Sequence, residues 1–346
     1  MQMKSREILN DENRIAQRNN GFMILSDLFA GKENNYLRKH VMTIGGIVGH
    51  PKDLQTAYRD PDKWVAECMD DLVEQICTSE TPLRFAPACI EYSIYGVHFI
   101  DKLFGAEVFF QNDQWYTKKL ETPVGELRFP DLENDETWGL ARRATLAFLA
   151  HNVKLPLFGM PTLSSALNII VNLYSGNALI TMMEEPEAFA QDLKTINDVI
   201  ITLHQWYKKN VPETQLQPVV SWSRTQPPGY GQLCGCTTQL VSGSAYREFI
   251  APLDDKLLGI YPGGGMMHLC GMHTQHIETL RDMKHLKAIQ INDRATVDLK
   301  AYFEGLRDDQ IIYLNPCESM TVNMAIEITG GRRLVICDAI NAPEIP

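Results

Sequence analysis

The sequence predicts an α/β protein: a (β/α)8 TIM-type barrel over residues 81–346, preceded by a helical extension over residues 1–80. Short apolar runs alternate with longer amphipathic segments, which is typical of a parallel sheet with helical crossovers. The last four apolar runs follow one another at intervals of roughly 20–25 residues, the spacing of β/α units. The length of the second part is close to the ~250 residues of a typical barrel. A doubly wound open sheet is the alternative, but no Gly-rich phosphate loop follows the first predicted strand.

The extension contains one clear amphipathic helix over residues 62–77. Trp64, Cys68, Leu72 and Ile76 are spaced four residues apart and form a single apolar stripe. Pro61 and Asp62 suit the start of this helix. We therefore interpret the two cysteines of this segment, Cys68 and Cys77, as core or near-core thiols.

The barrel segment contains seven predicted strands and six predicted helices. The strands are expected at 83–90, 155–159, 217–222, 265–270, 288–292, 310–314 and 333–337. The helices are expected at 162–174, 187–208, 244–258, 275–283, 297–306 and 319–328.

Composition excludes several classes of function. The 346-residue chain has 32 Lys and Arg against 43 Asp and Glu, and its formal charge of −11 argues against a nucleic-acid partner. It has no secretory signal at its N-terminus and no run of 18 apolar residues, so we expect a cytoplasmic protein without a membrane span. Eight cysteines are too few for a disulfide scaffold and are expected to be thiols.

The most informative segment for chemistry runs from Gly264 to His276. His268 and Cys270 are separated by one residue, so on a strand both side chains point to the same face. At the C-terminal end of a barrel strand this face is where active sites lie. An imidazole and a thiolate there are half of a zinc site, and a catalytic zinc needs only three protein ligands.

Further thiols follow other predicted strands. Cys337 ends the last strand, Cys317 follows the one before it, and Cys234 and Cys236 lie in a loop that is able to approach the same face. His273 and His276 come just after the 265–270 strand, where supporting or surface roles are expected.

Asp293 closes the predicted strand 288–292. Barrel enzymes place acids and bases at such strand ends, so Asp293 is the candidate catalytic residue. Capping of the next helix and orientation of a ligating histidine are the alternatives.

Several stretches, taken in order, resemble the uroporphyrinogen decarboxylase superfamily over roughly residues 80–337. They are Leu155-Pro-Leu-Phe-Gly-Met-Pro-Thr-Leu163, Tyr174-Ser-Gly176, Met183-Glu-Glu-Pro-Glu187, Leu240-Val-Ser-Gly-Ser-Ala-Tyr-Arg-Glu-Phe-Ile-Ala-Pro252 and His268-Leu-Cys-Gly271. The last of these is similar to the His-X-Cys-Gly motif of the zinc-dependent methylcobamide:thiol methyltransferases in that superfamily. Members of the superfamily are (β/α)8 barrels.

The resemblance implies a function. Zinc would be held by His268, Cys270 and a cysteine of the last strand, which is Cys337, with Cys317 as the alternative. A thiol or similar acceptor would take a methyl group from a corrinoid bound to a partner protein, and Asp293 would hold a ligand or handle the released proton. The resemblance also implies a small-molecule substrate and a homodimer.

Two other functions stay open. One is a metal-free decarboxylase or lyase, and the other is a barrel that binds a tetrapyrrole without catalysis. The decarboxylase branch uses an arginine-rich motif on its first strand to bind carboxylates. Here Arg84 is the only arginine in residues 83–93, which disfavours uroporphyrinogen itself as the substrate.

Overall fold

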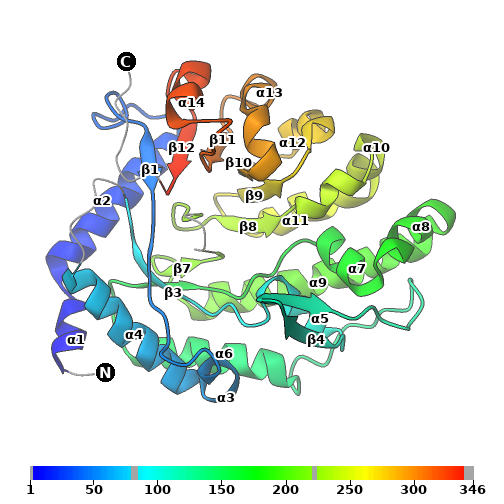
Figure 1. The fold of residues 1–346 in the computed structure, drawn as a ribbon, viewed down its shortest axis with the longest axis horizontal. Helices are drawn as coiled ribbons and strands as arrows, with labels where there is room; N and C mark the ends of the chain where they lie inside the picture. The colour runs from blue at the N-terminus through cyan, green and yellow to red at the C-terminus, as the bar shows by residue number, and fades with distance from the viewer. Residues whose placement is uncertain (1–2, 79–84, 220–223, 339–346) are drawn as a thin grey trace.

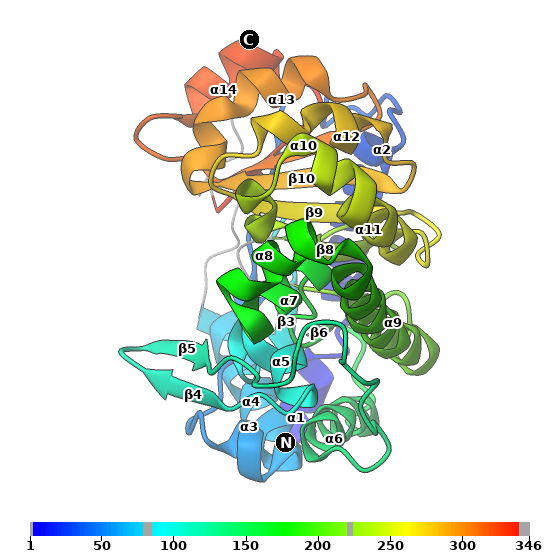
Figure 2. The same ribbon diagram turned by 90° about the vertical axis from the view of Figure 1, so that its right-hand side faces the viewer.

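The strands form two all-parallel sheets and one hairpin in the computed structural model, which describes residues 3–78, 85–219 and 224–338 (Figure 1). The six-stranded sheet has the order β1 (Met42–Ile44), β12 (Leu334–Cys337), β11 (Ile311–Leu314), β10 (Leu286–Asn292), β9 (Gly265–Cys270) and β8 (Gly231–Cys234). The four-stranded sheet has the order β2 (Ile47–Val48), β3 (Ala88–Glu91), β6 (Leu157–Gly159) and β7 (Leu216–Gln217). The hairpin consists of β4 (Val108–Gln111) and β5 (Gln114–Thr117) and projects from the body of the molecule in Figure 2.

The two sheets are joined along one side. β1 and β2 follow one another in the chain, and Ile44 forms a parallel bridge with Phe85. The Gly45 amide donates to the Phe85 carbonyl oxygen at 2.8 Å, and the Ile47 amide donates to that of Pro87 at 3.1 Å. All strands of both sheets therefore run in one direction. On the other side, the residues described for β7 and β8 do not pair, so the structure shows two joined parallel sheets.

Helices surround these sheets (Figures 1 and 2). They are α1 (Met3–Ile8), α2 (Glu12–Phe29), α3 (Thr56–Arg59), α4 (Pro61–Thr78), α5 (Phe99–Leu103), α6 (Glu136–Ala150), α7 (Ala166–Tyr174), α8 (Gly176–Glu184), α9 (Pro186–Asn210), α10 (Gly243–Ala245), α11 (Ala251–Leu258), α12 (Ile277–Asp282), α13 (Leu299–Gly305) and α14 (Val322–Thr329). The mixed α/β class with parallel strands is thus confirmed.

Local sequence signals explain where several helices begin and end. Asp11 and Asp135 cap α2 and α6 by accepting hydrogen bonds from main-chain amides of the first turn, and Thr321 caps α14 in the same way. Pro186 begins the long helix α9, where its missing N–H costs nothing. Gly330, with φ of +61°, ends α14 in the left-handed conformation that glycine favours.

The predicted amphipathic helix is confirmed as α4. Its four stripe residues are all buried in the main hydrophobic core. Cys77, by contrast, is exposed, so its interpretation as a near-core thiol was wrong. The residue lies off the stripe, on the solvent side of the same helix.

Helix α2 closes one end of the six-stranded sheet. Leu25 and Phe29 of α2 belong to a core cluster with side chains from the inner face of the strands. The Phe29 ring lies 4.9 Å from that of Tyr230, just before β8, and 6.2 Å from that of Tyr313 on β11. Because Tyr230 stands just before β8, α2 packs over the start of β8, and its cluster extends along the inner face as far as Cys337 at the end of β12.

Several strands differ from those expected. β1 and β2 lie inside the segment expected to be a helical extension, and β8 and the β4–β5 hairpin were not predicted. Residues 83–84 and 220–222 of the expected strands, Arg84 among them, lie outside the described residues. The described parts of these two strands are β3 and the two-residue β7.

The described helices were also compared with the length and apolarity that a membrane span requires. None of them meets this requirement by itself; α7 and α8 do so only as a pair that is bent by 108°.

Candidate metal centre

A cluster of thiols and one imidazole lies where β8 and β9 end side by side. Cys234, the last residue of β8, is the register partner of His268 on β9. The Gly235 amide then donates to the His268 carbonyl oxygen at 2.8 Å, and the chain turns into a 3₁₀ helix that begins at Cys236. This turn brings Cys236 back over the strand end. We call Cys234, Cys236 and His268 the thiol–imidazole group.

The ligand atoms of this group lie close together. The two sulfurs and the imidazole nitrogen are all within 4.8 Å of one another, and the Sγ atoms of Cys234 and Cys236 are 3.3 Å apart. The thiol of Cys270, two residues after His268, is hydrogen-bonded to that of Cys236. Three sulfurs and one imidazole thus converge, which is the set of donors that zinc prefers.

The imidazole of His268 is held in one orientation. It is only 5% exposed, and its Nδ1–H donates to Oε1 of Gln290, its register partner on β10. Burial, reinforced by the nearby Arg224, lowers the pKa of His268 to about 3. The ring is therefore neutral near pH 7 and keeps a lone pair on Nε2, which lies 3.5 Å from a guanidinium nitrogen of Arg224.

The pKa values of the three cysteines are shifted in different directions. The hydrogen bond between the two sulfurs lowers the pKa of Cys234 to about 6, and Arg224 and Asn168 act in the same direction. The contact with Cys236 also lowers the pKa of Cys270. The pKa of Cys236 itself is raised, because its proton is held by the other two sulfurs and because the residue is buried. Cys234 is therefore the sulfur of the cluster that is largely a thiolate near pH 7, the form that binds metals.

Hydrogen bonds lock the two loops that carry these cysteines. The Asn168 side chain, in the first turn of α7, donates to Cys234 Sγ at 3.3 Å and accepts from the Thr237 amide at 3.1 Å. On the other side, His276 donates to the Thr238 carbonyl oxygen at 2.8 Å, and His273 donates to that of Cys270. Both histidines are buried, and their hydrogen bonds hold these loops in place.

The other candidates from the sequence are not in the thiol–imidazole group. Cys337 lies at the end of β12, fully buried in the cluster that α2 covers, and burial raises the pKa of its thiol. Its place as the third ligand stays a prediction. Cys317 is exposed in a turn whose ends pair at Met320. Asp293 is exposed directly after β10, with φ of +49°, and its charge is felt by Cys270; its catalytic role also stays a prediction.

Two residues of the site were missed by sequence reasoning. Arg224 lies in the connection between β7 and β8, and Asn168 lies on an apolar helix. Neither stands in a motif, and both contact the cluster through tertiary packing alone. The C-X-C spacing of Cys234 and Cys236 was the one available signal.

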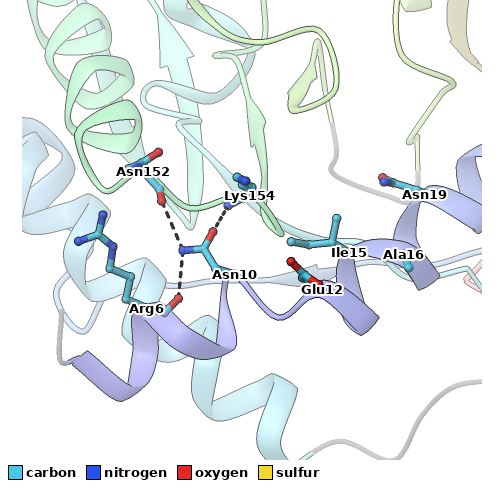
Figure 3. A pocket seen from close by; sticks show the side chains of 8 residues that line it. All are labelled: Arg6, Asn10, Glu12, Ile15, Ala16, Asn19, Asn152 and Lys154. Carbon is cyan, nitrogen blue, oxygen red and sulfur yellow. Dashed lines mark hydrogen bonds between the residues drawn. The ribbon is translucent and has the colours of Figure 1, made fainter.

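A separate hollow lies among α1, α2 and the connection from α6 to β6 (Figure 3). It has a volume of about 450 Å³ and a polar lining that includes Arg6 and Lys154. Asn10 bridges it by donating to the Arg6 and Asn152 carbonyl oxygens and accepting from the Lys154 amide. These bonds tie the N-terminal helices to the body of the protein, and the lining has no thiol or imidazole.

Comparison with known proteins shows the fold. No protein-family model and no curated protein matches the chain. Among solved structures, the chain is similar to a methyltransferase from Methanosarcina mazei, with a TM-score of 0.61 and 11% sequence identity over 93% of each chain. At this identity the likeness establishes that the two chains share their overall architecture.

Proposed function

We propose that the protein is a zinc-dependent methyltransferase that moves a methyl group from a corrinoid carrier to a thiol or similar acceptor. The observation that carries the proposal is the thiol–imidazole group at the C-terminal ends of parallel strands. The methyltransferase with a similar fold supports methyl transfer as the class of reaction. The corrinoid, its carrier protein, the cytoplasmic location and a homodimer follow from the resemblance to the methylcobamide:thiol methyltransferases.

The donor set fits zinc. A Zn–S bond of about 2.3 Å in a tetrahedral site places two sulfurs roughly 3.8 Å apart. The observed separation of 3.3 Å between Cys234 and Cys236, with all three ligand atoms within 4.8 Å, needs only small adjustments. Cys234, Cys236 and His268 would hold the ion, with Cys270 beside them as a further sulfur. When bound, zinc would hold an acceptor thiol in its deprotonated form and orient it.

The surrounding residues prepare the site for this chemistry. Gln290 fixes the tautomer that keeps a lone pair on His268 Nε2, which would bind zinc in place of its contact with Arg224. Arg224 supplies positive charge beside the sulfurs, which stabilises thiolates. We further propose that the two joined sheets close into one (β/α)8 barrel across β7 and β8, so that the group lies at its C-terminal mouth.

Metal content tests the proposal. The protein, purified under reducing conditions, should contain about one zinc per chain by elemental mass spectrometry, as a catalytic site of three ligands requires. The variants His268→Ala, Cys234→Ser and Cys236→Ser should lose it, and the exposed Cys317→Ala should keep it. Loss in Cys270→Ala and Cys337→Ala, with zinc kept in Cys234→Ser and Cys236→Ser, would replace the ligand set by the one that the resemblance implies. A wild-type protein that takes up no zinc would refute the thiol mechanism and favour a metal-free decarboxylase or a tetrapyrrole-binding barrel.

A further inference from the structure

A histidine–carboxylate pair outside the thiol–imidazole group lies after β3. His98 ends a 3₁₀ turn (Gly96–His98), and its Nδ1 lies 2.6 Å from Oδ2 of Asp101 at the start of the chain's next helix, α5. Asp101 is fully buried. Because β3 runs parallel to the strands of both sheets, the turn that follows it lies at the same edge as the ends of β8 and β9.

Helix α7 connects this pair with the thiol–imidazole group. Asn172 donates to Oδ2 of Asp101 at 2.9 Å, and Asn168, one turn earlier on the same helix, donates to Cys234 Sγ. Residues four apart lie on one helix face, about 6 Å apart along the axis. One face of α7 therefore carries the amide of Asn168, which contacts the thiol–imidazole group, and the amide of Asn172, which contacts Asp101.

The arrangement of His98 and Asp101 suits His98 Nε2 to accept a proton. Nδ1–H is held by the buried carboxylate, and Nε2 makes no hydrogen bond to another described residue and is not among the buried unpartnered atoms. A buried carboxylate behind one nitrogen fixes the tautomer and stabilises the imidazolium that forms when the other nitrogen takes a proton. The other carboxylate oxygen, Oδ1 of Asp101, is buried without a partner among the described residues, a cost that packing alone does not explain.

The backbone before His98 is strained. Tyr95 has φ of +59° and ψ of +9°, a left-handed conformation that is rare for an aromatic residue. Its ring is held between those of Tyr58 and Trp115, at 5.2 and 5.3 Å. Such strain persists where the surrounding structure enforces a particular placement, which here is that of His98.

We propose that His98 is the group that accepts the proton of the acceptor thiol; this rests on the proposed function. In the step, the S–H bond breaks and its proton passes to His98 Nε2. The sulfur electron pair forms the new S–CH₃ bond, and the carbon–cobalt bond breaks with its electron pair left on the corrinoid. Asp101 and Asn172 are positioning residues that orient the imidazole.

The test compares acceptors that need a base with acceptors that do not. Transfer from free methylcobalamin is measured with an alkyl thiol, which is mostly protonated near pH 7, and with an aromatic thiol, which is largely ionised. His98→Ala should slow the alkyl thiol about 100-fold, within the range for a lost general base, and should leave the aromatic thiol nearly unchanged. Added imidazole should restore part of the alkyl-thiol rate. Asp101→Asn should show the same selectivity with a smaller loss.

Controls separate the outcomes. The exposed His50→Ala should keep wild-type rates, and His98→Gln provides a second variant if His98→Ala folds poorly. Zinc content and circular dichroism of each variant must match the wild type. Equal losses with both thiols, or no loss with either, would overturn the role of His98 while leaving the methyltransferase proposal in place. A zinc-loaded wild type that methylates neither thiol would overturn both.

Discussion

The hydrogen bond between Gln290 and His268 gives the most direct prediction about the metal centre. Gln290 is fully buried; its side chain accepts from His268 Nδ1–H and donates to Oδ1 of Asn315. Gln290→Leu keeps the approximate shape but leaves both partners unpaired, at about 1–3 kcal/mol each. Burial of the leucine offsets part of this cost. We expect the metal-free protein to lose about 2–4 kcal/mol of unfolding free energy.

The same substitution should weaken zinc binding. Loss of a hydrogen bond that orients a ligating histidine typically lowers metal affinity 10- to 100-fold, or about 1.4–2.7 kcal/mol. Urea unfolding of the metal-free protein measures the first effect, and competition with a chromophoric chelator measures the second.

Gln310 offers a matched control. It is also fully buried, and its side chain donates to the carbonyl oxygens of Leu280 and Leu286 and accepts from the Arg307 amide. It lies just before β11, at the opposite end of the sheet from the thiol–imidazole group. Gln310→Leu should therefore lose comparable stability and bind zinc normally. If the two variants bind zinc equally well, Gln290 does not orient a ligand and the reasoning fails.

Three further predictions concern stability. Phe29→Ala should cost about 3–5 kcal/mol in urea unfolding, because the ring fills the space between two tyrosine rings under the sheet; a loss below 1 kcal/mol would mean that α2 does not close this end. Gly264→Ala places a Cβ against the carbonyl oxygen of His285 at φ of +74° and should lower the melting temperature more than Gly105→Ala, at φ of +83° with nothing within 4 Å; equal shifts would contradict this. Burial, and secondarily a nearby lysine, lowers the pKa of His204 to about 3, below its unfolded value near 6.5, so its contribution is complete above pH 6.5 and is lost as the pH falls toward 3. As the pH falls from 6.5 toward 3, the unfolding free energy of the wild type should therefore decrease more steeply than that of His204→Gln. The difference between the two slopes should be about 1.4 kcal/mol per pH unit, and parallel profiles would refute this.

Elements with a strong local period could be predicted from the sequence. The stripe of α4, the proline that begins α9, and the apolar runs of β9 to β12 all carry their signal within a short window. β1 and β2 could not be recognised, because Gly45 and Gly46 interrupt a short apolar run inside a region of helical character. β8 is only four residues long and stands among glycines and prolines.

The residues of the candidate site also differ in how far the sequence could predict them. His268 and Cys270 were identified because they end a clear strand. Cys234 and Cys236 were weighed only as loop residues, since their approach depends on the register of β8 against β9, which pairs Cys234 with His268. Arg224 and Asn168 gave no signal, because their relation to the cluster depends entirely on tertiary packing.

The pairing of β1 with β12 has a consequence for how the protein matures. Met42 and Val335 are partners in the sheet although they come from opposite ends of the sequence. While the chain is being synthesised, β1 has no neighbour on that side, and β11 likewise waits for β12. Two strand edges therefore stay unpaired until the residues of β12 have left the ribosome, and such edges are prone to association with other chains. A chain that stops before β12 is expected to aggregate or to be held by chaperones rather than to accumulate as a folded protein.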